Sequence, residues 1–184
     1  LQQHVDSILV IQNEKLREVH GDLKLSSAFA RADTILLQAA KGIAELITAS
    51  GYINVDFNDV QTIMQESGVA LMGSAVSSGE DRAIRVIEEA LTSPLLNNND
   101  ITGAKKILLN ITSGEDEITM EEVTHITDYV DSLIDADAMF IWGVGQDNKL
   151  KDQISVTIVA TGFEEDEDLI PELRGLALGY TEPK

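Results

Sequence analysis

A long amphipathic segment constrains the fold more than any other feature of this sequence. Between Phe29 and Ser50 the apolar residues recur every three or four positions, at Phe29, Ala32, Ile35, Leu36, Ala39, Ile43, Leu46 and Ile47. This spacing places them on one face of a helix of about six turns. We expect Ser26 or Ser27 to cap the helix and Gly51 to end it. The sequence therefore predicts a stiff helical rod. The next question is the role of the segment that follows it.

That next segment, from Gly51 to Val60, carries two aspartates three positions apart. Asp56 and Asp59 fall at the expected start of a helix over 57–67, so their carboxylates point roughly the same way. Asp56 can cap this helix, with Asp59 completing a capping pair. Alternatively, one or both carboxylates orient and polarise a water for attack on an electrophile. The two roles are compatible, because a cap also fixes where a carboxylate points.

No pattern in this sequence supplies the electrophile. It contains neither G-x-x-x-x-G-K-[ST] nor G-x-G-x-x-G, and the glycines of 143–145 lead into a polar segment rather than an apolar helix. His4, His20 and His125 are scattered without ligand spacing, so we assign no metal-binding residues. A self-contained Mg²⁺-dependent phosphatase is disfavoured, because it needs more convergent carboxylates and a phosphate anchor.

The net charge of the chain excludes some classes of binding partner. The 32 acidic and 13 basic side chains give a net charge of -19, which repels phosphate backbones and anionic lipid. We therefore expect no binding to nucleic acid and no direct membrane insertion. The chain has no cysteine, which excludes disulfides and thiolate nucleophiles.

The remaining periodicities predict a mixed sheet covered by helices. Strands are expected at 7–12, 68–78, 105–112, 137–145 and 153–162, and helices at 13–19, 57–67, 81–93 and 119–134. The nearly all-apolar strand 137–145 is typical of a central strand, and the alternation in 153–162 is typical of a half-covered one. The fold class is thus α/β (α+β), a long core helix followed by a mixed four-stranded sheet packed with helices.

Several segments resemble FtsZ, a family of bacterial cell-division GTPases within the tubulin superfamily. GYINVDFNDV is similar to the family's G-L-I-N-L-D-F-A-D-V, although Tyr52 stands where leucine is common. The family's other segments follow in the same order: LQQHVDSILVIQNEKL, AFARADTILLQAAKGIAELI, ALMGSAVSSGEDRA, SPLL, GAKKILLNIT and VTIVATGF. The resemblance covers nearly the whole chain to Phe163, with Gln12 in place of a usual proline.

The resemblance implies two groups of functional residues. Asn13, Phe29 and Asp33 match positions that contact the guanine base of GTP or GDP, with Phe29 stacking on the ring and Asp33 accepting hydrogen bonds.

The second group, Asn54, Asp56 and Asp59, matches a loop that enters the nucleotide site of the next subunit. There the two aspartates position the water that attacks the γ-phosphate, which supplies the missing electrophile in trans.

The resemblance also implies a domain organisation. Residues 1–24 would be a remnant of the nucleotide-binding domain, 25–50 the core helix, 51–163 a GTPase-activating domain and 164–184 the start of an acidic linker. Because Leu1 is not a start methionine and leads almost directly into a strand, we expect a fragment whose N-terminal neighbour is missing. The family's G-G-G-T-G-T-G signature belongs to that neighbour, and Mg²⁺ is a cofactor of the full-length protein, so we expect the chain alone to be inactive.

The implied function is assembly and turnover of the cytokinetic ring. Full-length subunits would join head to tail into cytoplasmic filaments at mid-cell, and other cell-division proteins and membrane tethers would bind a C-terminal peptide that is absent here. The alternative is a non-catalytic interaction module of a tubulin-like polymer, in which the two aspartates only cap a helix.

Overall fold

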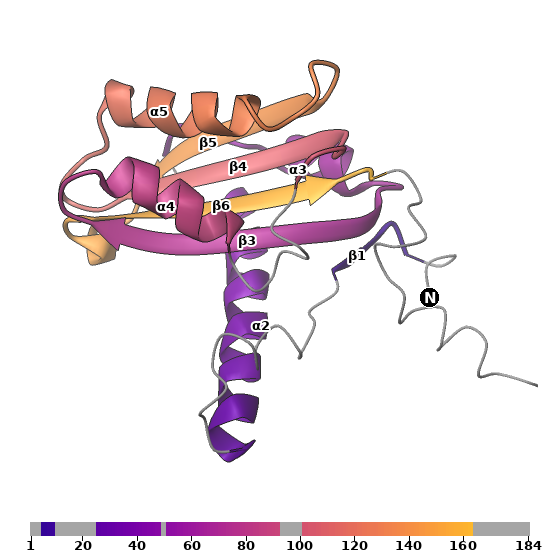
Figure 1. Cartoon of the computed structure of the whole chain (residues 1–184), viewed down its shortest axis with the longest axis horizontal. Coiled ribbons are helices and arrows are strands. Elements are labelled where there is room, and N and C mark those ends of the chain that lie inside the picture. Colours follow the sequence, from indigo (N-terminus) through magenta and orange to yellow (C-terminus); the bar gives the residue numbers. More distant parts are fainter. Residues whose placement is uncertain (1–4, 10–24, 49–50, 93–100, 164–184) are drawn as a thin grey trace, which may run out of the picture.

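Six strands form one mixed sheet in the computed structural model, which describes residues 5–9, 25–48, 51–92 and 101–163. In chain order, with the labels of Figure 1, the described elements are β1 (Ser7–Leu9), α2 (Leu25–Thr48), β2 (Gly51–Ile53), α3 (Phe57–Met64), β3 (Gly68–Ser78), α4 (Arg82–Leu91), β4 (Lys106–Ser113), α5 (Met120–Asp131), β5 (Met139–Gln146), the short 3-10 helix η2 (Asn148–Leu150) and β6 (Gln153–Thr161).

The four strands predicted after the rod form the centre of this sheet. The strand order is β1-β3-β6-β4-β5-β2. β6 runs antiparallel to both β3 and β4, whereas β4 and β5 are parallel. Two strands of three residues extend the predicted four-stranded sheet at its edges, with β1 parallel to β3 and β2 antiparallel to β5. Strands this short carry no readable periodicity, which is why β2 was not expected.

The predicted places of two strands are reversed. β6, expected to be half covered, lies between β3 and β4, while β5, expected to be central, lies beside the short edge strand β2. The alternation in β6 was misleading because a polar residue in the middle of the strand is also buried. Thr157 is buried, and its hydroxyl lies 3.3 Å from that of Ser74 on β3.

Helices cover both faces of the sheet, and each face has its own core. α4 and α5 pack on one face over a large cluster that includes Val86, Ile107, Ile126 and Ile158. α2 and α3 lie on the other face, over a smaller cluster that includes Ile63 and Met72. Figure 1 shows α2 standing away from the sheet, on the side opposite α4 and α5.

The rod is confirmed as a helix of 24 residues, but its expected N-cap is wrong. Ser26 and Ser27 lie inside α2, which begins at Leu25. Gly51 is the first residue of β2, and α2 ends at Thr48. Glycine is needed there for packing, because a Cβ at position 51 would overlap the backbone of Val144 on β5.

The remaining helices begin close to their predicted positions. α4 and α5 start at Arg82 and Met120, and the predicted capping box of α5 is present between Thr119 and Glu122. The segments predicted as a helix at 13–19 and as the end of a strand at 10–12 lie outside the described residues.

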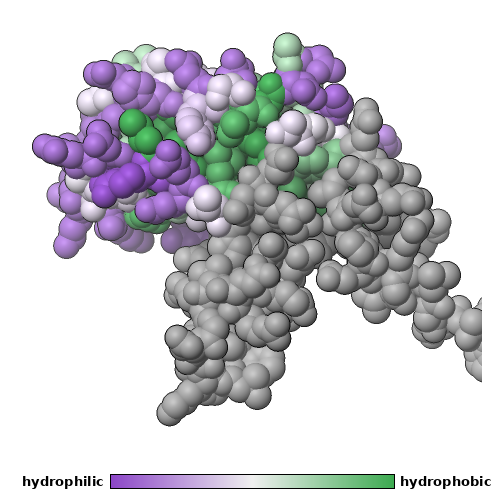
Figure 2. Space-filling view, viewed as in Figure 1, coloured by the Kyte–Doolittle hydropathy of each residue, from purple (hydrophilic) through white to green (hydrophobic). Residues whose placement is uncertain are grey.

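The side of the molecule drawn in Figure 2 combines hydrophilic and hydrophobic residues. Figure 2 shows hydrophilic residues over most of this side, with a hydrophobic band across its middle. Within the described ranges, no helix has the length and hydropathy needed to cross a bilayer.

Candidate functional site

The two aspartates of the acidic loop hold each other in place at the start of α3. The backbone N–H of Asp59 donates to Oδ1 of Asp56 at 2.8 Å, and the backbone N–H of Asp56 donates to Oδ2 of Asp59 at 3.1 Å. This reciprocal capping box satisfies backbone donors that a helix start leaves unpaired, and Asp59 also faces the positive end of the helix dipole. The predicted capping role is confirmed.

The cap uses only one oxygen of each carboxylate. Among the described residues, no hydrogen bond reaches Oδ2 of Asp56 or Oδ1 of Asp59. Asp56 is exposed and Asp59 is half-buried. A carboxylate oxygen in this state accepts a hydrogen bond from water, so the pair can bind and orient one at the end of the helix.

Asn54 is fixed by the same turn. Its side-chain Oδ1 accepts a hydrogen bond of 2.8 Å from the backbone N–H of Gly51, which closes the connection between β2 and α3. The side chain is otherwise exposed, which leaves its amide N–H groups directed to solvent. The loop therefore presents both hydrogen-bond donors and acceptors.

A buried valine anchors this loop to the sheet. Val55 is buried between exposed Asn54 and Asp56, and it belongs to the cluster under α3. The contact with β5 is close: a Cβ on Gly143 would lie 2.7 Å from Cγ2 of Val55 and 2.9 Å from the carbonyl oxygen of Ile53. Because position 143 is glycine, the loop can lie directly on the strand.

The far end of α3 is tied to the sheet by two side chains. Lys106 Nζ on β4 donates to the carbonyl oxygens of Thr62 at 2.9 Å and Gln65 at 3.4 Å. The buried hydroxyl of Thr161 on β6 donates to the carbonyl oxygen of Ile63 at 2.9 Å. These bonds satisfy helix carbonyls that would otherwise lack donors, and the lysine charge favours the negative end of the dipole. α3 is thus a rigid support for the aspartates.

Large hydrophobic side chains surround the loop and face solvent. Tyr52, Ile53 and Phe57 are 61%, 44% and 64% exposed. Contiguous exposed apolar residues are typical of a surface that another protein covers. The loop is therefore suited to a contact with a partner.

The residues predicted to contact the base are only partly described. Asp33 is exposed on α2, whereas Phe29 is known only as a residue of that helix and Asn13 lies outside the described residues. Asp33 precedes Thr48 by 15 positions, about 22 Å of helix at 1.5 Å per residue. α2 thus separates Asp33 from the acidic loop.

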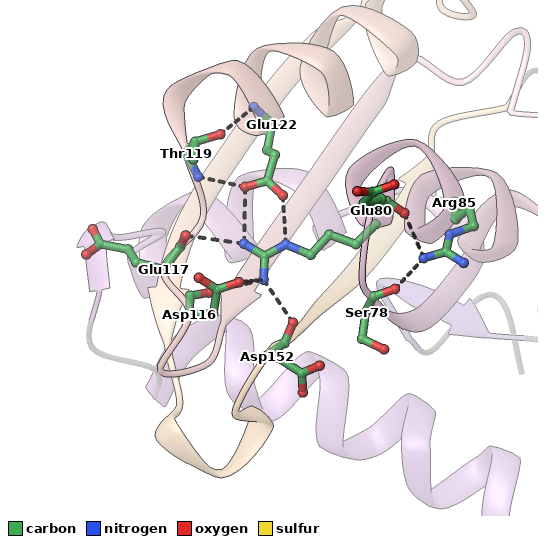
Figure 3. Close-up of polar contacts among 9 residues, drawn as sticks. Ser78, Glu80, Arg85, Asp116, Glu117, Thr119, Glu122 and Asp152 are labelled. Carbon is green, nitrogen blue, oxygen red and sulfur yellow. Dashed lines mark hydrogen bonds and ion pairs between the residues drawn. The ribbon is translucent and has the colours of Figure 1, made fainter.

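Arg82 organises a second polar cluster near the loop, which the sequence did not predict (Figure 3). Its side chain is 6% exposed and pairs with Glu122 through Nε at 2.7 Å and with Asp116 through Nη1 at 2.8 Å. It also donates to the backbone carbonyls of Asp116, Glu117 and Asp152. Its spacing in the sequence could have indicated its burial, because Arg82 lies four positions before Val86 and therefore on the same, buried face of α4.

The acidic and basic groups here shift the pKa of two side chains, Glu122 in the cluster and Tyr52 on β2. The hydrogen bond from Arg82 lowers the pKa of Glu122, and desolvation only partly opposes it. The pKa of the Tyr52 phenol is raised by the nearby Glu117 carboxylate, which favours the protonated phenol.

Other ionisable residues form no comparable site in the described ranges. His125 is exposed on α5, while His4 and His20 lie outside those ranges. In the described part of the chain, no group of three or more His, Cys, Asp or Glu side chains is placed to hold a metal ion.

The fold is that of tubulin-like proteins. The structure superposes on the FtsZ dimer of M. jannaschii with a TM-score of 0.80 and 42% identity, covering 88% of this chain and 47% of that one. It also matches TubZ from GDP-form protofilaments of Bacillus thuringiensis serovar israelensis, with a TM-score of 0.73 over 94% of this chain and 46% of that one. At 10% identity, the second match shows the fold alone.

The sequence comparisons define the family. The model of the FtsZ family, C-terminal domain, matches residues 68–164. The cell division protein FtsZ of Porphyromonas gingivalis is 44% identical over 90% of this chain, and FtsZ 1 of Thermococcus kodakarensis is 45% identical over 88%. This chain therefore belongs to the FtsZ family. It spans 36% and 43% of the lengths of these two relatives.

Proposed function

We propose that this chain is the C-terminal part of a filament-forming cell-division GTPase, and that its acidic loop activates hydrolysis of GTP bound by the adjacent subunit. The observation that carries the proposal is the loop itself. Asp56 and Asp59 are locked on a supported helix with one oxygen each left for water, and exposed hydrophobic side chains surround them.

The proposed chemistry needs only orientation and charge from this chain. GTP, bound with Mg²⁺ to the adjacent subunit, supplies the γ-phosphate as the electrophile. The free oxygens of Asp56 and Asp59 accept hydrogen bonds from the attacking water and favour its deprotonation. The Asn54 amide donates to a neighbouring oxygen and limits how the water can turn.

In this proposal the rod connects two half-sites. Residues 1–24 belong to the nucleotide-binding domain, 51–163 form the activating domain and 164–184 begin an acidic linker. The exposed carboxylate of Asp33 fits the contact with guanine, because it can accept hydrogen bonds from the imino and amino groups of the base. Asn13 and Phe29 complete that contact in the same subunit.

Self-association supports the trans arrangement. The M. jannaschii FtsZ was solved as a dimer and TubZ as protofilaments. A head-to-tail contact between unlike surfaces does not close, so it builds filaments. We place the full-length protein in the cytoplasm at the mid-cell ring, with other cell-division proteins and membrane tethers as further partners.

The decisive variants are Asp56→Asn and Asp59→Asn in a full-length FtsZ that carries this chain. Asparagine still caps a helix but has no negative charge, so α3 and filament assembly should persist. We expect GTP turnover to fall by at least about 100-fold, the range of a lost general base. Asp81→Asn is the matched control, since Asp81 precedes α4 without a side-chain cap bond. Near-normal turnover in both loop variants would rule out the catalytic assignment.

A mixing experiment tests whether activation occurs in trans. Asp56→Asn subunits keep their nucleotide site, and a second variant with a disabled phosphate-binding loop keeps its acidic loop. Each variant alone should be inactive. The mixture should recover GTP turnover at the contacts where an intact nucleotide site meets an intact acidic loop. No recovery despite co-assembly would contradict activation in trans.

The alternative is a non-catalytic interaction module of a tubulin-like polymer. The capping box supports this alternative, because helix capping alone is enough to explain the positions of both aspartates. It predicts that Asp56→Asn leaves turnover unchanged, whereas substitutions of the exposed Tyr52 and Phe57 weaken assembly. The same two assays therefore separate the hypotheses.

A further inference from the structure

α3 is too short to hold its own direction. It has eight residues, whereas isolated helices need about 12–15 residues to be stable in water. Of these eight residues, only Val60 and Ile63 are buried. The direction in which α3 presents Asp56 and Asp59 must therefore be set by contacts with the rest of the domain.

Side chains bind the carbonyl groups at the end of α3. A helix leaves its last carbonyls without partners inside the helix. Here the four consecutive carbonyls of residues 62–65 each accept a hydrogen bond from a side chain, at 2.9 Å for the first three and 3.4 Å for the last. The donors are Lys106 Nζ for the first and the last, the Thr161 hydroxyl for the second and the Ser67 hydroxyl for the third.

Two of these donors lie opposite each other in the sheet. Lys106 on β4 and Thr161 on β6 are paired residues of antiparallel strands. Side chains of such a pair point to the same face, with Cβ atoms about 4.5–5.5 Å apart. Thr161 is buried, and β6 lies between β3 and β4. The pair therefore ties the end of α3 to the centre of the sheet, and the lysine charge favours the negative end of the helix dipole.

We propose that Lys106 and Thr161 are positioning residues for GTP hydrolysis, which fix the axis of α3 and so the direction in which its two aspartates meet the adjacent subunit. The inference rests on the proposed function of the acidic loop. Both residues act through the helix, because the carbonyl of Thr62 lies six positions beyond Asp56, about 9 Å at 1.5 Å per residue. Misplacing reacting groups by about 1 Å can slow a reaction about 100-fold, so a loosened helix axis is enough to lower the rate.

Removing either donor tests the proposal in a full-length FtsZ that carries this chain. Lys106→Met keeps the aliphatic stem without the ammonium group, and Thr161→Val keeps the branched shape without the hydroxyl. Each should lower kcat for GTP about threefold to tenfold, because α3 loses one anchor and keeps the others. The critical concentration for assembly should stay unchanged, because the hydrophobic side chains around the loop remain in place. Full turnover in both variants would overturn the proposal.

Two matched variants test whether the lost donor is the cause. Thr161→Ser keeps the hydroxyl, so kcat should return to within about twofold of the unsubstituted protein. Lys105→Met removes the neighbouring lysine, whose ammonium group pairs with Asp135 at 3.4 Å, and should leave kcat unchanged. The proposal is wrong if Thr161→Ser is as slow as Thr161→Val, or if Lys105→Met is as slow as Lys106→Met.

A change of background separates positioning from a general loss of stability. When Asp56 and Asp59 are both replaced by asparagine, no catalytic carboxylate remains to be positioned. Adding Lys106→Met to that background should therefore leave the residual single-turnover rate unchanged. An equal fractional loss in both backgrounds would show that Lys106 acts in some way other than through the aspartates.

Amide hydrogen exchange tests the anchor without hydrolysis. In unassembled protein with GDP, Lys106→Met should speed exchange of the α3 amides, whereas those of α5 should exchange as in the unsubstituted protein. Unchanged exchange in α3 would rule out the anchor. If Asp56→Asn retains turnover, the proposed function fails; if Asp56→Asn is inactive but Lys106→Met and Thr161→Val have full turnover, only the positioning role fails.

Discussion

Replacing Arg82 by methionine should reveal how much the polar cluster contributes to stability. Methionine keeps most of the aliphatic stem, so the change removes mainly the guanidinium. The lost contacts are the ion pairs with Glu122 and Asp116 and the hydrogen bonds to three backbone carbonyls. These contacts connect the start of α4 to the loop before α5 and to the turn before β6.

Burial decides the expected magnitude. The Arg82 and Glu122 side chains are 6% and 21% exposed, so Glu122 is left largely out of water without its cation. Removing one partner from a buried pair costs about 3–5 kcal/mol. The carboxylate of Asp116 is 69% exposed and adds at most about 1 kcal/mol, because solvent screens it. We expect a loss of about 3–4 kcal/mol, which lowers Tm by roughly 10 °C in a chain of this size.

The effect should depend on pH in a defined direction. The Arg82 hydrogen bond holds the pKa of Glu122 below its usual 4.5 in the folded protein. A lowered carboxyl pKa stabilises the fold above the unfolded value, and this stability disappears as the pH falls through the folded value. The difference between the unsubstituted chain and Arg82→Met should therefore be full at pH 7 and shrink below about pH 4.5.

Urea denaturation followed by the fluorescence of Trp142, the single tryptophan of the chain, measures both effects. Arg85→Met is the matched control on the same helix, because within the described ranges the exposed Arg85 side chain donates only to the carbonyls of Ser78 and Glu80. It should cost less than about 1 kcal/mol. The reasoning would be refuted if Arg82→Met lowered the free energy of unfolding by no more than Arg85→Met does. It would also be refuted if the loss in Arg82→Met stayed constant from pH 7 to about 3.

Three further outcomes test other parts of the structure. Gly143→Ala should cost about 1–3 kcal/mol by urea denaturation and lower GTP turnover, because its Cβ would meet Cγ2 of Val55 at 2.7 Å; unchanged values would contradict the close packing. Thr119→Ala should cost about 1 kcal/mol through the lost cap of α5. Thr124→Ala should cost less, because it removes an exposed methyl group and a hydroxyl that bonds to the Met120 carbonyl within the helix and caps nothing. The chain alone should release no phosphate from GTP in a phosphate-release assay, and measurable turnover would show that it does not need a separate nucleotide-binding part.

Local patterns predicted much of this fold because their causes are local. The strand at 68–78 and the capping boxes at Asp56 and Thr119 were predicted from spacing, since alternation and side-chain caps involve residues only a few positions apart. The same reasoning predicted that Asp56 and Asp59 point together, which the reciprocal bonds confirm.

The features that were not predicted depend on residues far apart in sequence. The central place of β6 is set by pairing with β3 and β4, more than 40 positions away, and period alone could not show that both faces are covered. Gly51 was predicted to stop a helix, but its packing against Val144 determines its role. Arg82 contacts residues 34 to 70 positions further on, so no short motif marks it.

The capping box explains why the proposed site uses two aspartates rather than one. A single capping carboxylate would be held by one backbone N–H, and the N–H of the cap residue would have no side-chain acceptor. Here each aspartate is held by a bond from the backbone of the other, so both directions are fixed before any partner arrives. Val55 and Gly143 fix the loop to β5 from below, and Lys106 and Thr161 fix the far end of α3. A site that acts on a neighbouring subunit cannot rely on its substrate for alignment, because the substrate belongs to the other molecule. The alignment must therefore be built into this chain, and the packing beneath the loop provides it.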